Sequence, residues 1–222
     1  MSASPSLILA IDQGTTGSRA VLYDSKGHVR GSSYQELRQY YPRPGWVEHD
    51  PLEILHSVSR VVREALSNAR SSPQRIAGIG ITNQRETTLL WERKSGRPVG
   101  RAMVWQDRRT AARCEALKRR GYEALFREKT GLLLDPYFSG TKIQWMLEES
   151  ASLKKRASRG EILFGTVDSW LLWNLTGRRV HATDATNASR TLLLNLKKVD
   201  WDSEILKILG IPKALLPEVH PS

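Results

Sequence analysis

The stretch that most constrains the fold lies near the N-terminus, where an apolar run of strand length, residues 7–11, ends at the carboxylate of Asp12. A turn of small hydroxyl residues follows and leads to Arg19, after which residues 20–23 are apolar again. This alternation predicts a strand, a polar turn and a second strand. Such a turn gathers backbone N–H groups, hydroxyls and a cation, which suits phosphate, and Asp12 could hold a hydrated Mg²⁺ beside it. An ordinary hairpin turn is the alternative.

The rest of the chain predicts an α/β fold. A third strand is expected at 28–34, and a helix at 51–68 with Asp50 as its N-cap and Pro51 at its first position. A buried strand is expected at 76–82, with polar residues at its exit. Further strands are expected at 89–91 and 102–105, and helices at 110–117 (capped by Thr110), 140–147, 167–175 and 203–209. Three antiparallel strands followed by alternating helices and strands predict a mixed sheet flanked by helices.

The single cysteine, Cys114, excludes an internal disulfide and fits a reducing compartment. No apolar run reaches membrane-spanning length, and the N-terminus lacks the pattern of a signal peptide. These features favour a cytoplasmic location and argue against membrane insertion.

The net charge of +11 raises the possibility of a nucleic-acid partner. The basic residues cluster around 108–120 and 154–159, on segments with helical apolar spacing and interspersed Glu and Ala. No nucleic-acid motif is visible, so solvated helix faces are the preferred interpretation. Such a surface would also attract anionic substrates.

Two further strand ends carry polar or aromatic residues. Arg85 and Glu86 would offer several donors and two acceptor oxygens to a small molecule with neighbouring hydroxyls, or they form a surface ion pair of little energetic value. Trp105 is either a flat apolar wall for a substrate's carbon chain or part of the core. Tyr137, in a loop that enters a helix, is either a phenol facing ligand or a half-buried anchor.

Several long motifs, in order along nearly the whole chain, resemble the FGGY family of carbohydrate kinases, and among them the kinases of glycerol. The matching stretches are Asp12-Gln13-Gly14-Thr15-Thr16, Pro44 to Pro51, Gly80 to Thr88, Val104 to Arg109, Asp135 to Lys142, Phe164 to Asp168 and Thr183 to Arg190. The resemblance implies the actin/hexokinase/Hsp70-like (ribonuclease H-like) fold. It also implies transfer of the γ-phosphoryl group of ATP to glycerol, with Mg²⁺, to give sn-glycerol 3-phosphate.

The resemblance implies a role for each matching residue. The nucleotide phosphates would be contacted by Thr15, Thr16, Gly17 and Arg19, and the metal by Asp12. Glycerol would be bound by Arg85, Glu86 and Tyr137, with Trp105 as the apolar wall. Gly17 stands where many relatives have serine, so a side-chain hydroxyl is lost there while the backbone N–H remains.

The resemblance also implies that residues 1–222 form the first, substrate-binding domain of a two-domain kinase. The family's catalytic aspartate, in an Asp-Gln-Gln motif, does not occur in these residues. We therefore expect the 222-residue chain alone to be inactive, without its C-terminal nucleotide-binding domain, and homo-oligomers are possible. The alternative is a non-catalytic relic or glycerol-binding module.

Overall fold

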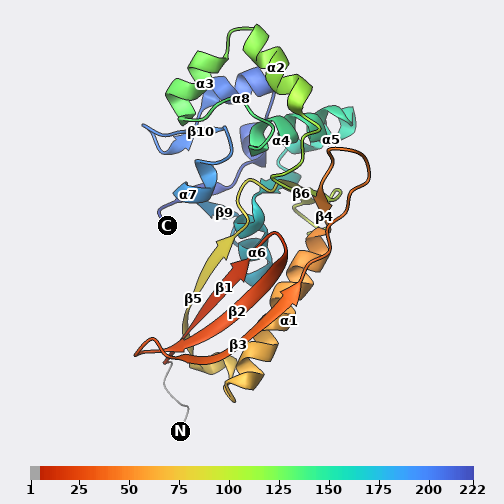
Figure 1. Ribbon diagram of the computed structural model, residues 1–222. Helices are drawn as coiled ribbons and strands as arrows, with labels where there is room; N and C mark the ends of the chain where they lie inside the picture. The colour runs from red at the N-terminus through yellow and green to blue at the C-terminus, as the bar shows by residue number, and fades with distance from the viewer. Residues whose placement is uncertain (1–5) are drawn as a thin grey trace. The chain divides into compact units, whose positions relative to one another are not determined.

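The structure of the chain, a computed structural model, describes residues 6–222 and separates into two compact units (Figure 1). Unit 1 takes in the residues up to Gln39 together with Asp50–Gln84. Unit 2 takes in Tyr40–His49 and Arg85–Ser222. Within the described residues, no helix is both long enough and apolar enough to cross a membrane.

Unit 1 is a mixed sheet with one long helix packed on it (Figure 1). Its elements are β1 (Leu7–Gln13), β2 (Gly17–Asp24), β3 (Val29–Glu36), α1 (Pro51–Asn68), a 3₁₀ turn (Pro73–Arg75) and β5 (Ile76–Asn83). The strand order across the described part of the sheet is β3-β2-β1-β5. The β1–β2 and β2–β3 pairs are antiparallel and the β1–β5 pair is parallel, as the mixed sheet required.

Helix α1 begins and ends as expected from its sequence. The Asp50 side chain accepts a hydrogen bond from the backbone N–H of Leu52 at 2.8 Å, and Pro51 occupies the first turn. The helix packs against β2 and β3, and Gly31 permits the close approach. A Cβ at Gly31 would lie 2.4 Å from the carbonyl oxygen of Ala65, so a side chain cannot be accommodated there without movement.

Strand β5 forms where it was predicted, but the prediction that it is buried is wrong. Its residues alternate between half-buried and exposed, and the side chain of Ile79 is 54% exposed. The reason is its place in the sheet: β5 lies at the edge opposite β3, whereas α1 covers β2 and β3. The apolar run therefore predicted the position of the strand correctly, but it did not predict how deeply the strand is buried.

Unit 2 is built from short strands and helices around one apolar cluster. Its first half contains β4 (Glu48–His49), β6 (Leu89–Glu92), β7 (Ala102–Met103), α2 (Ala111–Arg119), α3 (Glu123–Thr130), α4 (Ser139–Glu148) and α5 (Ala151–Ser158). Its second half contains β8 (Ile162–Gly165), α6 (Val167–Leu175), β9 (Ala182–Asp184), α7 (Ala185–Ala188), β10 (Leu194–Asn195), β11 (Asp200–Trp201), α8 (Ser203–Leu209), a 3₁₀ turn (Lys213–Leu215) and β12 (Glu218–His220). The strands pair in twos, namely β4 with β7, β6 with β8, β9 with β12 and β10 with β11.

The apolar cluster of unit 2 joins α3, α4, β8 and α8. Phe126, Ile143, Phe164 and Ile205 are almost fully buried in it. Trp170 and Trp173 of α6 are also buried, and both lie near the ring of Trp91.

Two local predictions in unit 2 need correction. The strand expected at 102–105 ends at Met103, because Trp105 begins a turn that is closed by a hydrogen bond from the Asp107 N–H to the Val104 carbonyl at 2.9 Å. Thr110 precedes α2 but makes no side-chain capping bond. Its hydroxyl instead lies 2.9 Å from the hydroxyl of Thr141 on α4, so a tertiary contact replaces the local cap.

Candidate functional site

The polar turn between β1 and β2 forms within unit 1 as predicted. The N–H of Gly14 donates to the carbonyl of Gly17 at 2.8 Å, which closes the turn. Asp12 and Arg19 are register partners on the two strands, and both are exposed. The turn therefore collects a carboxylate, hydroxyls, backbone amides and a guanidinium within a few residues. Asp12, Thr15, Thr16, Gly17 and Arg19, the predicted phosphate-side residues, all lie in this turn or the strand ends beside it.

Gly17 is required by the packing behind the turn. A Cβ at this position would lie 2.5 Å from the carbonyl oxygen of Gln35 and 2.5 Å from the hydroxyl oxygen of Tyr34. The Tyr34 hydroxyl also donates to the carbonyl of Thr16 at 3.4 Å, and the Arg19 guanidinium lies 5.5 Å from the Tyr34 ring centroid. The phenol of Tyr34 thus fills the space that a side chain at position 17 would need.

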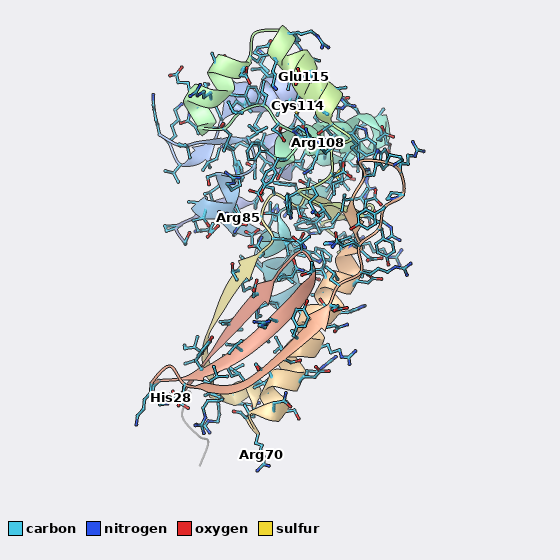
Figure 2. All side chains as sticks on the ribbon, viewed as in Figure 1. His28, Arg70, Arg85, Arg108, Cys114 and Glu115 are labelled. Carbon is cyan, nitrogen blue, oxygen red and sulfur yellow. The ribbon has the colours of Figure 1, made fainter. Side chains whose placement is uncertain are left out.

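A second cluster, in unit 2, begins with Arg85 and Glu86. Arg85 is exposed and is labelled in Figure 2. Glu86 is buried, with 3% of its surface exposed, and its backbone adopts a left-handed φ of 65°. This conformation costs a non-glycine residue about 1–3 kcal/mol and persists only where the surroundings impose it. Adjacent charges in the sequence therefore have different environments, and Glu86 is not half of a surface pair with Arg85.

Arg190 balances the buried charge of Glu86. Its Nε donates to the Glu86 carboxylate at 2.6 Å, across 104 residues of sequence. The same guanidinium lies 4.9 Å from the Phe138 ring centroid and 5.6 Å from that of Tyr137. Arg190 therefore joins the carboxylate to the aromatic loop that enters α4.

Tyr137 and Trp105 form an aromatic wall in the same cluster. Their ring centroids are 5.2 Å apart and both side chains are half-buried, so neither residue is wholly core. The Tyr137 N–H donates to the Asp135 side chain at 2.8 Å, which fixes the loop before α4. Through Arg190, the structure brings together three of the predicted substrate-side residues, Glu86, Trp105 and Tyr137.

Lys142 of α4 contacts the backbone of both wall residues and is completely buried. Its ε-amino group donates to the carbonyl of Tyr137 at 2.9 Å and to that of Trp105 at 3.5 Å. Burial lowers the pKa of Lys142 to about 7, although the nearby carboxylates of Asp107 and Glu86 act in the opposite direction.

Residues 7–222 match the model of the N-terminal domain of the FGGY family of carbohydrate kinases. The chain belongs to this family.

Curated relatives of this FGGY chain are glycerol kinases. Over 215 residues, or 97% of the chain, it is 60% identical to the glycerol kinase of Thermus brockianus and 56% identical to glycerol kinase 2 of Thermotoga maritima. Among solved structures, the glycerol kinase of Plasmodium falciparum with ADP is 33% identical over 97% of the chain, with a TM-score of 0.90. The chain spans 43% of the length of each of these three proteins.

Sequence reasoning missed two residues of the FGGY chain's second cluster, Arg190 and Lys142. Both fall in stretches that carried the family resemblance, yet neither had an assigned role. A buried Glu86 requires a cation, but nothing local to Glu86 points to a partner 104 positions away. The signal for Lys142 was its position on the apolar side of a helix, beside Ile143, where a lysine is unusual.

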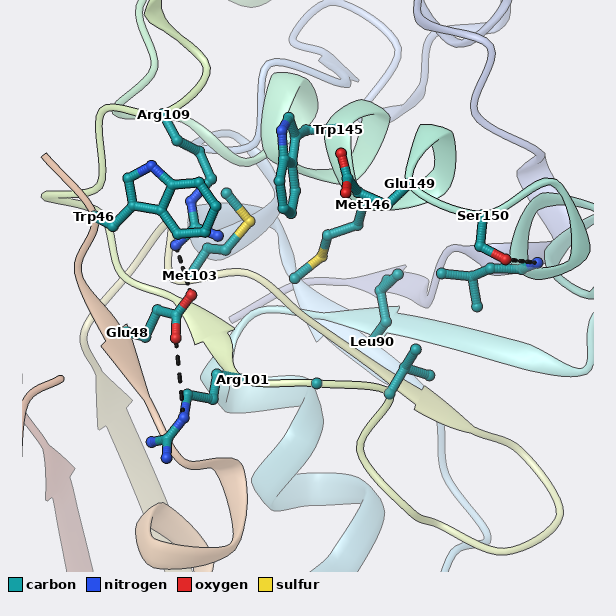
Figure 3. A pocket seen from close by; sticks show the side chains of 13 residues that line it. Trp46, Glu48, Leu90, Arg101, Met103, Arg109, Trp145, Met146, Glu149 and Ser150 are labelled. Atoms are coloured by element: carbon teal, nitrogen blue, oxygen red, sulfur yellow. Dashed lines mark hydrogen bonds and ion pairs between the residues drawn. The ribbon is translucent and has the colours of Figure 1, made fainter. Parts of the chain in front are cut away.

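A separate hollow of about 390 Å³ lies elsewhere in unit 2 (Figure 3). The guanidinium of Arg109 lies over the rings of Trp46 and Trp145, at 3.5 Å and 5.0 Å from their centroids. Arg109 also donates to Glu48 and to the fully buried Asp107, both at 2.7 Å. This network holds the segment that follows Trp105 in place.

Proposed function

We propose that this FGGY chain supplies the glycerol-binding part of an ATP-dependent glycerol kinase, in which the γ-phosphoryl group of ATP passes to a terminal hydroxyl of glycerol. The product would be sn-glycerol 3-phosphate. The observation that carries the proposal is the buried Glu86 carboxylate, held by Arg190 beside the wall of Trp105 and Tyr137. The 54–60% identity to curated glycerol kinases supports glycerol as the substrate.

The cluster in unit 2 has the chemistry that a small polyol requires. The carboxylate of Glu86 would accept hydrogen bonds from hydroxyl groups, and Arg85 and the Tyr137 phenol would donate to them. Trp105 would cover the carbon chain. A ligand that lacks one of these hydroxyls would leave a buried polar group without its partner and bind much more weakly.

The turn in unit 1 has the chemistry that a polyphosphate requires. Thr15, Thr16, Gly17 and Arg19 would contact phosphate oxygens through hydroxyls, backbone N–H groups and a guanidinium. Residues 6–222 contain no group of three or more His, Cys, Asp or Glu side chains placed to hold a metal. Asp12 would bind Mg²⁺ as a single carboxylate, with water and phosphate oxygens completing the shell, which is how this ion is commonly held. Bound there, Mg²⁺ would neutralise charge on the phosphates.

Phosphoryl transfer also needs a group that accepts the proton of the attacking hydroxyl. As that oxygen bonds to the γ-phosphorus, the bond to the bridging oxygen of ADP breaks and the proton passes to the base. The Asp-Gln-Gln motif that carries this base in the family is not among these 222 residues. We therefore propose that the chain by itself binds glycerol without turning it over, which is also the property of a binding module.

Glycerol titration of the ¹⁵N-labelled 222-residue chain tests the proposal. Shifts of the Trp105 indole N–H should saturate with glycerol and fail to do so with propane-1,2-diol or propane-1,3-diol, each of which lacks one hydroxyl. Glu86→Gln and Arg85→Ala should weaken binding about tenfold or more. The controls Glu149→Gln and Arg119→Ala alter exposed side chains and should leave it unchanged. Equal response to all three polyols would contradict the proposed site.

An assay of the same pure chain separates catalysis from binding. ATP consumption should not depend on glycerol. Glycerol-dependent ADP formation by the chain alone would overturn this part of the proposal and require a proton acceptor within residues 1–222.

A further inference from the structure

The first turn of α4 contacts the backbone of each part of the substrate cluster. The Ser139 hydroxyl donates to the carbonyl of Glu86 at 3.0 Å. One turn later, Lys142 donates to the carbonyls of Tyr137 and Trp105. These three contacted residues come from separate segments of the chain, so α4 is the element that they share.

Burial of Lys142 carries a large cost in free energy. Transfer of a charged amine into a protein interior is strongly unfavourable, and methionine or leucine would fill a similar volume without that penalty. Its ε-amino group forms no close ion pair within residues 6–222, because its hydrogen bonds go to two backbone carbonyls. A role in holding those carbonyls accounts for its presence.

We propose that Lys142 is a positioning residue, whose ε-amino group fixes the backbone of Tyr137 and Trp105 and so holds the aromatic wall in the shape that glycerol needs. The inference deepens the proposed function and rests on it, because it takes this wall to be the glycerol site. The two side chains contact each other at 5.2 Å between ring centroids, so a change in either backbone carbonyl alters the wall.

The charge state of Lys142 should make the rigidity of the aromatic wall depend on pH. The charged groups that act on its amine are Asp107, Glu86, Arg109 and Asp135. Because burial brings the pKa of Lys142 to about 7, the amine changes its charge within an accessible range. The charged form makes the stronger hydrogen bonds to carbonyls. The wall should therefore be held more firmly below the Lys142 pKa than above it.

The variant Lys142→Met removes the amine and keeps the length and apolar stem of the side chain. In the 222-residue chain, the nuclear Overhauser contact between the Trp105 and Tyr137 rings should be lost, and the glycerol dissociation constant should rise about tenfold. The matched control is Lys155→Met on α5, an exposed lysine, which should retain both. A folded Lys142→Met variant with the ring contact and glycerol affinity unchanged would overturn the proposal.

The ring contact is measured without ligand, so the two proposals fail separately. If glycerol does not bind the unmodified chain, the proposed function fails, while loss of the ring contact in Lys142→Met still supports the positioning role. If glycerol binds and the ring contact survives the substitution, the positioning role fails alone.

A titration of the unmodified chain decides the matter even if Lys142→Met does not fold. The ¹³Cε shift of Lys142 should change with a midpoint near the pKa of about 7. The indole N–H shift of Trp105 should follow with the same midpoint, since the two groups are joined through the Trp105 carbonyl. An indole shift that stays constant while Lys142 titrates would contradict the proposal.

Discussion

The turn at Asp12–Arg19 and the cluster around Glu86 are both candidate binding regions, but they are built in different ways. The turn comes from consecutive residues and is closed by the hydrogen bond between Gly14 and Gly17, while the Leu37 N–H and the Tyr34 hydroxyl both donate to the Thr16 carbonyl. The cluster is gathered from four segments and depends on contacts from α4 and Arg190. The difference teaches that the functional groups of the turn come from one short stretch of sequence, whereas those of the cluster depend on tertiary contacts among residues far apart in the chain.

The two units also differ in which spectroscopic measurements can follow their unfolding. All seven tryptophans of the chain lie in unit 2, so tryptophan fluorescence follows the cluster and is silent on the turn. Tyr34, which packs behind the turn, lies in unit 1. Far-ultraviolet circular dichroism detects the secondary structure of both units, so together with tryptophan fluorescence it separates unfolding of unit 1 from unfolding of unit 2.

The largest effect is expected from Arg190→Ala. It leaves the buried Glu86 carboxylate without its cation, and loss of one partner of a buried pair costs about 3–5 kcal/mol. Urea denaturation followed by tryptophan fluorescence measures the loss. The exposed pair of Arg159 and Glu161 in the same unit gives the control, since Arg159→Ala should lower stability far less than Arg190→Ala. The double variant Arg190→Ala/Glu86→Gln should recover much of the loss, and failure to recover would show that the charge is not its cause.

Gly17→Ser should destabilise unit 1 by about 1–3 kcal/mol, because the new Cβ collides with the Gln35 carbonyl and the Tyr34 hydroxyl. Circular dichroism in urea measures this change. Gly80→Ser is the matched control in the same sheet, since a Cβ there meets nothing within 4 Å. Equal effects of the two substitutions would argue that conformational freedom and not space is what requires glycine at position 17.

Acid should weaken unit 2 through His181. Burial lowers the pKa of His181 to about 4, and its Nε2 lies 2.7 Å from the carbonyl oxygen of Phe164. The unfolded chain binds the proton at about pH 6.5, so stability from this group is complete above that pH and is lost as pH falls toward 4. The expected loss is about 1–2 kcal/mol between pH 6.5 and pH 5. In His181→Gln, the slope of unit 2 stability against pH over this range should be smaller, and an unchanged slope would assign the effect to other groups.

The smallest effect is expected from Arg108→Ala. Arg108, labelled in Figure 2, is exposed and lies 3.7 Å from the partly exposed Asp135. Surface pairs of this kind contribute about 0–1 kcal/mol. Stability in urea and glycerol affinity should therefore stay close to those of the unmodified chain. A large loss of affinity would mean that the pair of Arg108 and Asp135, and not Lys142 alone, holds the aromatic wall in place.

The same contrast explains what could be predicted from the sequence. The turn, the cap of α1 and the sheet of unit 1 follow from local patterns, and the α/β fold with a mixed sheet is confirmed. The exposure of Ile79 could not be predicted, because it depends on which strands α1 covers. The Thr110–Thr141 contact and the Arg190–Glu86 pair were likewise out of reach, since each joins residues far apart in the chain. The ligand roles of Arg85, Glu86, Trp105 and Tyr137 stay predictions.

The rate at which a thiol reagent labels Cys114 can report local opening motions of unit 2. The thiol is buried at 1% exposure on α2, its Sγ lies 3.8 Å from the Thr141 hydroxyl on α4, and burial raises its pKa to about 11. In the closed state it should hardly react, because the thiolate is the nucleophile. A thiol reagent would therefore label the chain only during excursions that separate α2 from α4. Since Thr141 adjoins Lys142, the labelling rate would report how often the support of the aromatic wall opens.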